Sequence, residues 1–180
     1  MAEIKILLLR GVNVGGANRL PMPEFREMLT GLGLSKVETH IQSGNAVFLD
    51  PGVADLPGRI GAMMKTLFGF SPALFILTLA QYEAVLRANP YAAAGREDGS
   101  KVHLYFLAGP EKGFDLGGVM ALAQGGEALH LTDACLYMNS PNGVGRSALA
   151  EKLPKYLKGA HTARNQRSAE SILALARSIA

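Results

Sequence analysis

The stretch Val37-Glu-Thr-His-Ile-Gln-Ser-Gly-Asn-Ala-Val-Phe-Leu49 is the strongest indication of how this chain folds. Residues 37–41 and 46–49 have the β-branched and apolar content of strands. Between them, Gln42-Ser-Gly-Asn45 supplies Gly and Asn, which tolerate the positive φ angles of a tight turn. The stretch therefore predicts two strands joined as a β-hairpin.

A strand and a helix are expected on each side of this hairpin. Residues 4–10 predict a buried strand, and Pro21-Met-Pro23 introduces a helix whose apolar residues recur at helical spacing up to Gly33. After the hairpin, Asp55 can cap a second helix, and residues 73–78 predict a further strand. The order β-α-β-β-α-β is the split βαβ arrangement of ferredoxin-like folds.

The second half repeats this order more loosely. Strands are expected over 101–107, 128–131, 135–139 and 161–163, with helices near 116–123 and after Ser147, and a final helix capped by Asn165 or Ser168. Pro154 predicts a kink or an early stop in the helix after Ser147. We predict an α+β protein of two ferredoxin-like subdomains, 1–90 and 91–180, packed in one compact chain with a C-terminal helix. The boundary is placed at the polar loop 95–100.

Composition limits the classes of protein that remain. The chain has 180 residues, 48% of them apolar, which is enough for a substantial core. No apolar run is long enough for a membrane span, and the run after Lys5 stops at Arg10, too early for a signal peptide. The single cysteine, Cys135, excludes an internal disulfide and favours a reducing compartment. We therefore expect a cytoplasmic protein.

Charge is unevenly distributed. The net charge is only +3, but from Arg146 onward the chain carries seven basic and two acidic residues. This basic segment would attract phosphate or nucleic acid. The alternative is that its lysines lie on the solvated face of a helix.

Three polar clusters interrupt the expected elements. The first joins the loop Arg10-Gly-Val-Asn-Val-Gly-Gly-Ala-Asn-Arg19 to the hairpin turn. Its candidate ligand-binding residues are Arg10, Asn13, Gly15, Gly16, Asn18, Arg19, Gln42, Ser43 and Asn45.

Two interpretations of this loop stay open. Gly11 and Gly16 have the outer spacing of a phosphate-binding loop, but Ala17 stands where that motif needs Lys, and the GxGxxG dinucleotide pattern is absent. The loop can still form a nest of backbone amides for an anion, assisted by an arginine. Alternatively, it is a tight connection whose Asn side chains satisfy its own backbone.

The other two clusters each lead into a helix. One spans 139–147 and offers Asn142 and Arg146; the other spans 162–167 and offers Arg164 and Asn165. A helix N-terminus with a nearby arginine is a natural anion site. In the plainer interpretation these residues are only caps and turns.

Several chemistries are not indicated. None of the clusters contains Asp or Glu, so no positioned carboxylate pair is visible. The four histidines lack metal-ligand spacing and no Cys-x-x-Cys occurs, so we predict no metal and no cofactor. His40 and His161 lie next to clusters and are the candidates for a catalytic imidazole. Cys135 lies in an apolar strand, where a thiol is usually inert.

The clusters resemble the signature of one bacterial family, the domain of unknown function DUF1697. The similar segments include Arg10-Gly-Val-Asn-Val-Gly-Gly-Ala-Asn-Arg19, Thr39-His-Ile-Gln-Ser-Gly-Asn-Ala-Val-Phe48, Pro141-Asn-Gly-Val-Gly-Arg-Ser147 and Thr162-Ala-Arg-Asn165. The resemblance covers essentially the whole chain and implies two α+β subdomains, with no assigned activity. It also implies Tyr where this chain has His40 and Trp where it has Gln166. A pocket built on that Trp would be altered here, whereas a Trp that only packed would leave little changed.

Three functional hypotheses follow. The first is a cytoplasmic binding protein for a phosphate-bearing small molecule, nucleotide or nucleic acid, since amides and guanidinium groups recognise charge without proton transfer. The second is a transferase or hydrolase acting on a phosphorylated substrate, with His40 or His161 as the acid–base group. The third is a module that binds a protein partner through an exposed, apolar sheet face.

Overall fold

The computed structural model describes residues 2–180, which form two compact units. The first comprises the residues up to Ala84 together with Ser171–Ala180, and the second comprises Val85–Glu170. The division falls within two helices, α3 (Leu79–Arg87) and α7 (Gln166–Ser178).

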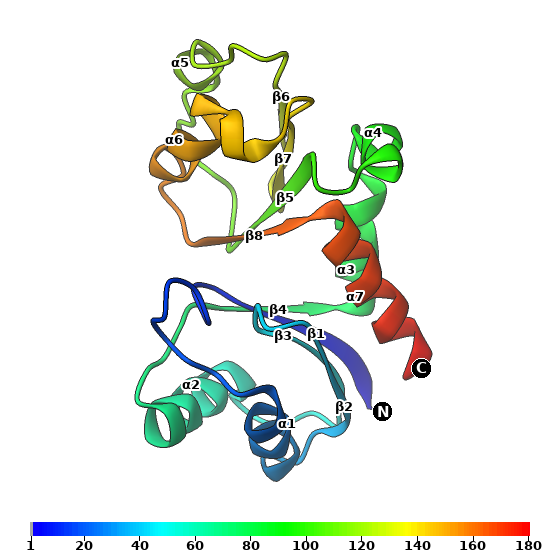
Figure 1. Cartoon of the computed structure of the whole chain (residues 1–180). Coiled ribbons are helices and arrows are strands. Elements are labelled where there is room, and N and C mark those ends of the chain that lie inside the picture. The colour runs from blue at the N-terminus through cyan, green and yellow to red at the C-terminus, as the bar shows by residue number, and fades with distance from the viewer. Residues whose placement is uncertain (1) are drawn as a thin grey trace. The chain divides into compact units, whose positions relative to one another are not determined.

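The first unit has the expected β-α-β-β-α-β order (Figure 1). Its elements are β1 (Glu3–Leu9), α1 (Met22–Gly31), β2 (Ser35–His40), β3 (Asn45–Asp50), α2 (Leu56–Phe68) and β4 (Leu74–Thr78). The strands form one sheet in the order β2-β3-β1-β4, and each neighbouring pair is antiparallel. This is the ferredoxin-like arrangement, because the hairpin strand β3 lies beside β1.

Helices α1 and α2 cover one face of this sheet (Figure 1). Leu7 and Phe48 from the sheet and Phe25 and Ile60 from the helices are fully buried in one apolar cluster. The helix boundaries follow local chemistry: the side chain of Asp55 accepts a hydrogen bond from the Gly58 amide at the start of α2.

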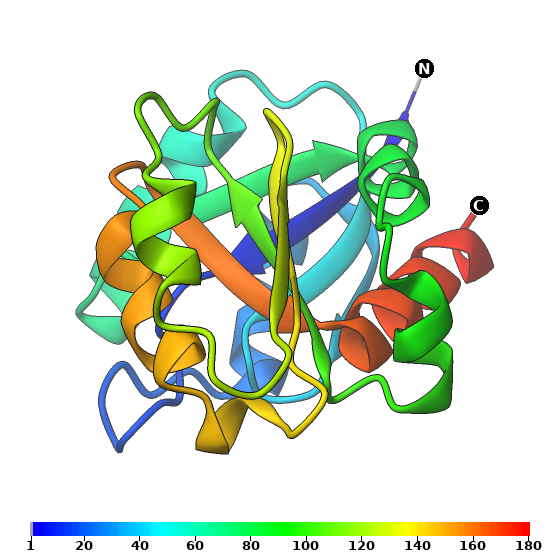
Figure 2. The same cartoon turned by 90° about the horizontal axis from the view of Figure 1, so that it is seen from above.

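The second unit repeats the same topology. Its elements are α4 (Ala92–Glu97), β5 (Val102–Leu107), α5 (Leu116–Met120), β6 (Ala128–Leu131), β7 (Cys135–Asn139), the 3-10 turn η1 (Val144–Arg146), α6 (Ala148–Tyr156) and β8 (His161–Asn165). The sheet order β6-β7-β5-β8 corresponds strand by strand to that of the first unit. Viewed from above, α5 and α6 lie side by side (Figure 2), and the residues they bury include Val119, Leu149 and Leu153. The predicted α+β fold of two ferredoxin-like subdomains is confirmed.

Two local expectations need correction. The segment 95–100, expected to be a loop, begins within α4, because three alanines favour helix and the Gly95 amide bonds to the Tyr91 carbonyl at 3.0 Å. Pro154 lies inside α6, which ends at Tyr156. The last strand is also longer than expected, since β8 extends to Asn165.

Candidate functional site

The glycine-rich loop after β1 is closed at its base by the side chains of its asparagines. Asn13 accepts a hydrogen bond from the Leu20 amide at 2.8 Å and donates to the Leu20 carbonyl at 3.0 Å. The side-chain amide of Asn18 donates to the Gly11 carbonyl at 3.0 Å, and the backbone amide of Asn13 donates to the Asn18 carbonyl at 3.1 Å. The two ends of the loop are therefore held together.

Both asparagines have left-handed backbone angles. The φ angle is +54° at Asn13 and +51° at Asn18, a region that Asn adopts more readily than most residues. Gly15 and Gly16, at the tip, also have positive φ, and a Cβ at either would meet nothing within 4 Å. The tip glycines are therefore needed for backbone conformation and leave the backbone open to solvent.

The hairpin turn is bonded to this loop. The side-chain amide of Asn13 donates to the Gln42 carbonyl at 2.7 Å, and the Leu9 amide donates to the Gly44 carbonyl at 2.8 Å. Inside the turn, buried Asn45 donates to the His40 carbonyl at 3.0 Å and to the Ser43 hydroxyl at 2.8 Å. The loop and the turn, which the sequence analysis had grouped in one cluster, are therefore in contact.

Arg10 and Arg19 flank the base of the loop and are exposed. Gly11 and Asn18 are bonded to each other, and the two arginines are their outer neighbours in the chain. Within residues 2–180, neither guanidinium group takes part in a hydrogen bond or an ion pair. Both interpretations of the loop can therefore hold together. The Asn side chains are structural, and the arginines are available for an anion.

His40 ends strand β2 beside the turn and pairs with Asn45 in the hairpin register. Its side chain is partly buried, and burial lowers the pKa of the imidazole from 6.5. At neutral pH this histidine is therefore neutral.

The second cluster lies at the start of α6, in the second unit. Asn142 donates to the Gly125 carbonyl at 3.2 Å, and Ser147 caps α6 by accepting from the Ala150 amide at 3.1 Å. The carboxylate of Glu127 accepts hydrogen bonds from the amides of Gln124 and Gly125, at 3.1 and 2.7 Å. A hydrogen bond from the Ser147 hydroxyl, followed by those backbone amides, lowers the pKa of Glu127.

The chain therefore supplies its own anion at this helix N-terminus. Glu127 is a buried carboxylate held in its charged form by these donors. The sequence did not single out Glu127, because it lies twenty residues before the cap that it contacts. Arg146 is exposed at the edge of the same region.

The third cluster is built into the sheet. Arg164 lies on β8 with only 8% of its surface exposed, and its guanidinium donates to the Thr162 hydroxyl at 2.9 Å and to the Ala163 carbonyl at 2.7 Å. Asn165 caps α7 by accepting from the Ser168 amide at 2.8 Å. Their proposed role as ligand-binding residues stays a prediction, and their hydrogen bonds show a structural role.

Gln166 is a buried connector between α7 and the segment around α4. It accepts from the Asn89 side chain at 3.0 Å and donates to the Ala92 carbonyl at 3.1 Å and to Glu170 at 2.7 Å. Gly95 lies against it so closely that any Cβ there would overlap the Gln166 amide. The residue at which the resemblance had implied Trp is therefore a packed, hydrogen-bonded position in this chain.

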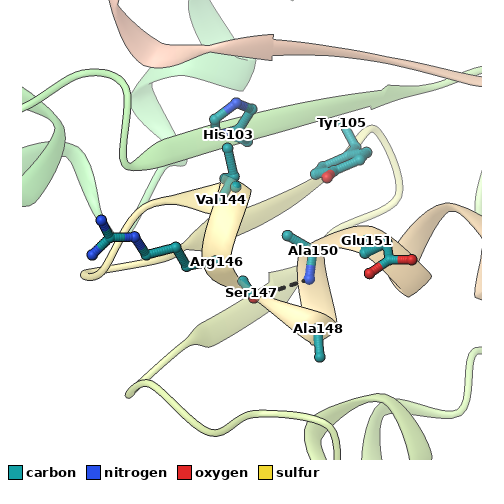
Figure 3. Close-up of a pocket in the computed structure, with 9 residues that line it drawn as sticks. His103, Tyr105, Val144, Arg146, Ser147, Ala148, Ala150 and Glu151 are labelled. Carbon is teal, nitrogen blue, oxygen red and sulfur yellow. Dashed lines mark hydrogen bonds between the residues drawn. The ribbon is translucent and has the colours of Figure 1, made fainter.

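A pocket that the sequence did not indicate opens in the second unit. It has a volume of about 640 Å³ and lies between β5 and the segment from Val144 to Glu151 (Figure 3). His103 and Tyr105 line it from alternate positions of β5. In the sequence, the only indication of this pocket is that a histidine and a tyrosine lie two residues apart on one face of a strand. A histidine and a tyrosine packed in the core would give the same pattern.

His161 and Cys135 are both buried in the second unit. His161 is 5% exposed, and its Nδ1 lies 3.0 Å from the Gly159 carbonyl. Cys135 is fully buried, and burial raises the pKa of its thiol. Among residues 2–180, no group of three potential metal ligands occurs. In that same part of the chain, no helix combines the length and apolarity needed to cross a bilayer.

The comparisons with known proteins agree with this architecture. A solved structure described as that of the conserved bacterial protein SP0830 from Streptococcus pneumoniae has a TM-score of 0.74 and 28% sequence identity, with 98% of this chain and 99% of that chain covered. The search of curated proteins found no match. The sequence profile of the family described as Protein of unknown function (DUF1697) matches residues 2–137. This chain therefore belongs to the DUF1697 family.

Proposed function

We propose that the protein binds a phosphate-bearing anion at the base of the Arg10–Arg19 loop. The observation that carries the proposal is that the Asn and Arg side chains of the loop have different surroundings. The Asn13 and Asn18 side chains are used to hold the loop closed, while the exposed guanidinium groups of Arg10 and Arg19 have no acidic partner among residues 2–180. Guanidinium groups match the geometry of phosphate oxygens through paired hydrogen bonds.

Preorganisation supports this proposal. The loop is held by hydrogen bonds at its base and joined to the hairpin turn by the bond from Asn13 to Gln42. A loop that is already ordered loses less conformational entropy when a ligand binds. Two arginines beside an ordered loop are also more than a strand-to-helix connection requires, since a neutral turn would close the chain equally well.

A thermal-shift experiment tests the proposal. The wild-type protein and the variants Arg10→Ala, Arg19→Ala and Arg59→Ala are heated at constant ionic strength with inorganic phosphate, pyrophosphate, ATP or a short oligonucleotide. Arg59 is an exposed arginine on α2 of the same unit and provides the control of equal charge change. A ligand at about 100 times its Kd stabilises the folded state by about 2.7 kcal/mol, which corresponds to several degrees.

The variants distinguish the outcomes. We expect a shift in the wild type and in Arg59→Ala that is lost in Arg10→Ala and Arg19→Ala. A stronger response to the oligonucleotide with a steep salt dependence would identify nucleic acid as the source of the phosphate. Flat curves for every probe, or equal shifts in all four proteins, would refute the anion site.

His40 favours an enzyme as the second candidate function. It lies beside the same turn, and burial keeps its imidazole in the neutral form that a general base needs at pH 7. Hydrolysis of p-nitrophenyl phosphate or of ATP that is abolished by His40→Gln, while phosphate binding persists, would support catalysis. Binding without turnover of either substrate would favour the binding protein.

A further inference from the structure

The pocket of the second unit contains two polar side chains that leave a polar atom without a partner. Tyr105 is 6% exposed, and its hydroxyl makes no hydrogen bond within residues 2–180. The Nδ1 atom of His103 is buried and also lacks a hydrogen-bond partner in the described part of the chain. A buried polar atom without a partner is destabilising. Because His103 Nδ1 is closed off from the pocket, the Tyr105 hydroxyl is the group available to a molecule that enters it.

Both side chains line the same hollow (Figure 3). They occupy alternate positions of β5, where His103 pairs with Met138 and Tyr105 pairs with Leu136 of β7. Both partners belong to the face of the sheet that α6 covers. The rings therefore form an aromatic wall whose available polar group is the Tyr105 hydroxyl.

Small residues on the opposite wall create the space. Gly145, Ala148 and Ala150 line the pocket, whereas Leu149 and Leu153 of α6 are fully buried in the core. A larger side chain at Ala150 would fill the hollow. The volume of about 640 Å³ lies within the range of small-molecule sites.

The charges around the pocket compensate one another. Arg146 and Glu151 both line it and carry opposite charges. Behind the start of α6, the ionised carboxylate of Glu127 receives the hydrogen bond from Ser147 and offsets the positive end of the helix dipole. The pocket therefore has no excess of positive charge to attract an anion, whereas the Arg10–Arg19 loop does.

The polar groups of the wall are themselves neutral at pH 7. Burial raises the pKa of Tyr105 to about 12, so the hydroxyl keeps its proton. Burial also lowers the pKa of His103, so the imidazole is uncharged. The Tyr105 phenol can donate a hydrogen bond to a ring nitrogen or a carbonyl, or accept one from a ring N–H group.

We propose that this pocket binds a neutral, planar nitrogen heterocycle of about the size of a nucleobase or nicotinamide. The flat faces of the ligand pack between the His103–Tyr105 wall and the alanines of α6. Its polar edge bonds to the Tyr105 hydroxyl, and one of its faces packs on the His103 ring. The site lies entirely within the second unit, so it does not depend on the anion site proposed for the first.

Ligand-detected NMR and calorimetry with adenine, cytosine and nicotinamide test this proposal, with toluene as the ring that lacks polar atoms. The variants are Tyr105→Phe, which removes one oxygen from a buried ring, and Ala150→Leu, which fills the hollow on a helix that tolerates leucine. Arg10→Ala serves as the control for the anion site.

At least one heterocycle is expected to bind saturably with a Kd of about 1 mM or tighter. Tyr105→Phe should weaken it about tenfold, Ala150→Leu should abolish binding, and Arg10→Ala should leave the Kd unchanged. The proposal is overturned if no heterocycle binds, if toluene binds equally well, or if folded Tyr105→Phe retains the wild-type Kd. Loss of phosphate binding in Arg10→Ala with heterocycle binding intact would separate the two sites.

Discussion

Gly44 and Leu9 are in direct contact across the base of the hairpin turn. The Leu9 amide donates to the Gly44 carbonyl at 2.8 Å, and a Cβ built on Gly44 would lie 2.8 Å from the Cβ of Leu9 and 2.6 Å from Cγ2 of Val12. The φ angle of Gly44 is +75°. Glycine is therefore required here both by the backbone angle and by the close approach of the loop.

Replacing Gly44 with Ala should destabilise the protein by about 2 to 5 kcal/mol, the combined cost of a left-handed alanine and of overpacking. Urea denaturation measures the change. Gly15→Ala is the matched control, since Gly15 also has positive φ but a Cβ there would have no neighbour within 4 Å. It should lose only about 1 to 2 kcal/mol. Equal losses in the two variants would contradict the close contact.

Asn13 should be needed for the order of the Arg10–Arg19 loop. Asn13→Gly keeps a residue that accepts positive φ but removes the side-chain bonds to Leu20 and Gln42. We expect a loss of about 1 to 3 kcal/mol in the free energy of unfolding, together with weaker phosphate binding. Faster amide exchange across the loop, measured by NMR, would show the cause, whereas unchanged exchange would argue against a bracing role.

Gly95 and Gln166 should be energetically coupled. A methyl group at residue 95 would displace the Gln166 amide from its bonds with Asn89 and Ala92. Gly95→Ala is expected to cost about 1 to 3 kcal/mol in the wild type, and much less in a Gln166→Ala background. A double-mutant cycle by chemical denaturation measures the coupling. Additive effects would show that the two positions are independent.

His103 should make the protein less stable as the solution is acidified. Burial lowers its folded-state pKa below 6.5, so between that lower value and 6.5 the unfolded chain binds more protons than the folded chain. The free energy of unfolding therefore falls as pH decreases through this window. His103→Gln should reduce this dependence, and NMR titration of the imidazole should give a midpoint below 6.5. A midpoint at or above 6.5 would contradict the burial of His103.

Glu127 should stabilise the protein at neutral pH and lose this effect in acid. Its pKa is lowered, first by the Ser147 hydroxyl and then by backbone amides, so its contribution is present above 4.5 and disappears as pH falls through the lower folded-state value. Glu127→Gln is expected to cost about 1 to 3 kcal/mol at pH 7 and little at pH 3. Chemical denaturation at the two pH values checks this difference, and an equal cost at both would refute it.

Local chemistry made much of the fold predictable. The hairpin at 42–45, the caps at Asp55, Ser147 and Asn165, and the periodic apolar faces act over a few residues. Such signals act on neighbouring residues, so they can be recognised without tertiary information. The segment 95–100 was misjudged because its Gly and charged residues were given more weight than the three alanines that begin α4.

The candidate site was predictable only in part. The Gly, Asn and Arg content of residues 10–19 marked an unusual loop. Composition alone did not show that the asparagines hold the loop closed while the arginines remain exposed. The same content at 162–167 marked a segment whose Arg164 is buried and bonded within β8. An arginine in the exposed loop and an arginine buried in β8 look the same in the sequence. Only the surroundings in the folded chain show which one is available to a ligand and which one is structural.

The order of strands and helices, the hairpin and the caps follow from the amino-acid sequence without further information, because they depend on interactions between near neighbours. Which polar residues are used internally and which remain available follows only from the packed chain. Gln166 meets Asn89 across 77 positions, Asn13 meets Gln42 across 29, and the side chains of His103 and Tyr105 line a hollow made by alanines more than forty residues away. Whether a polar group is satisfied or left open depends on such distant partners, which no local pattern encodes.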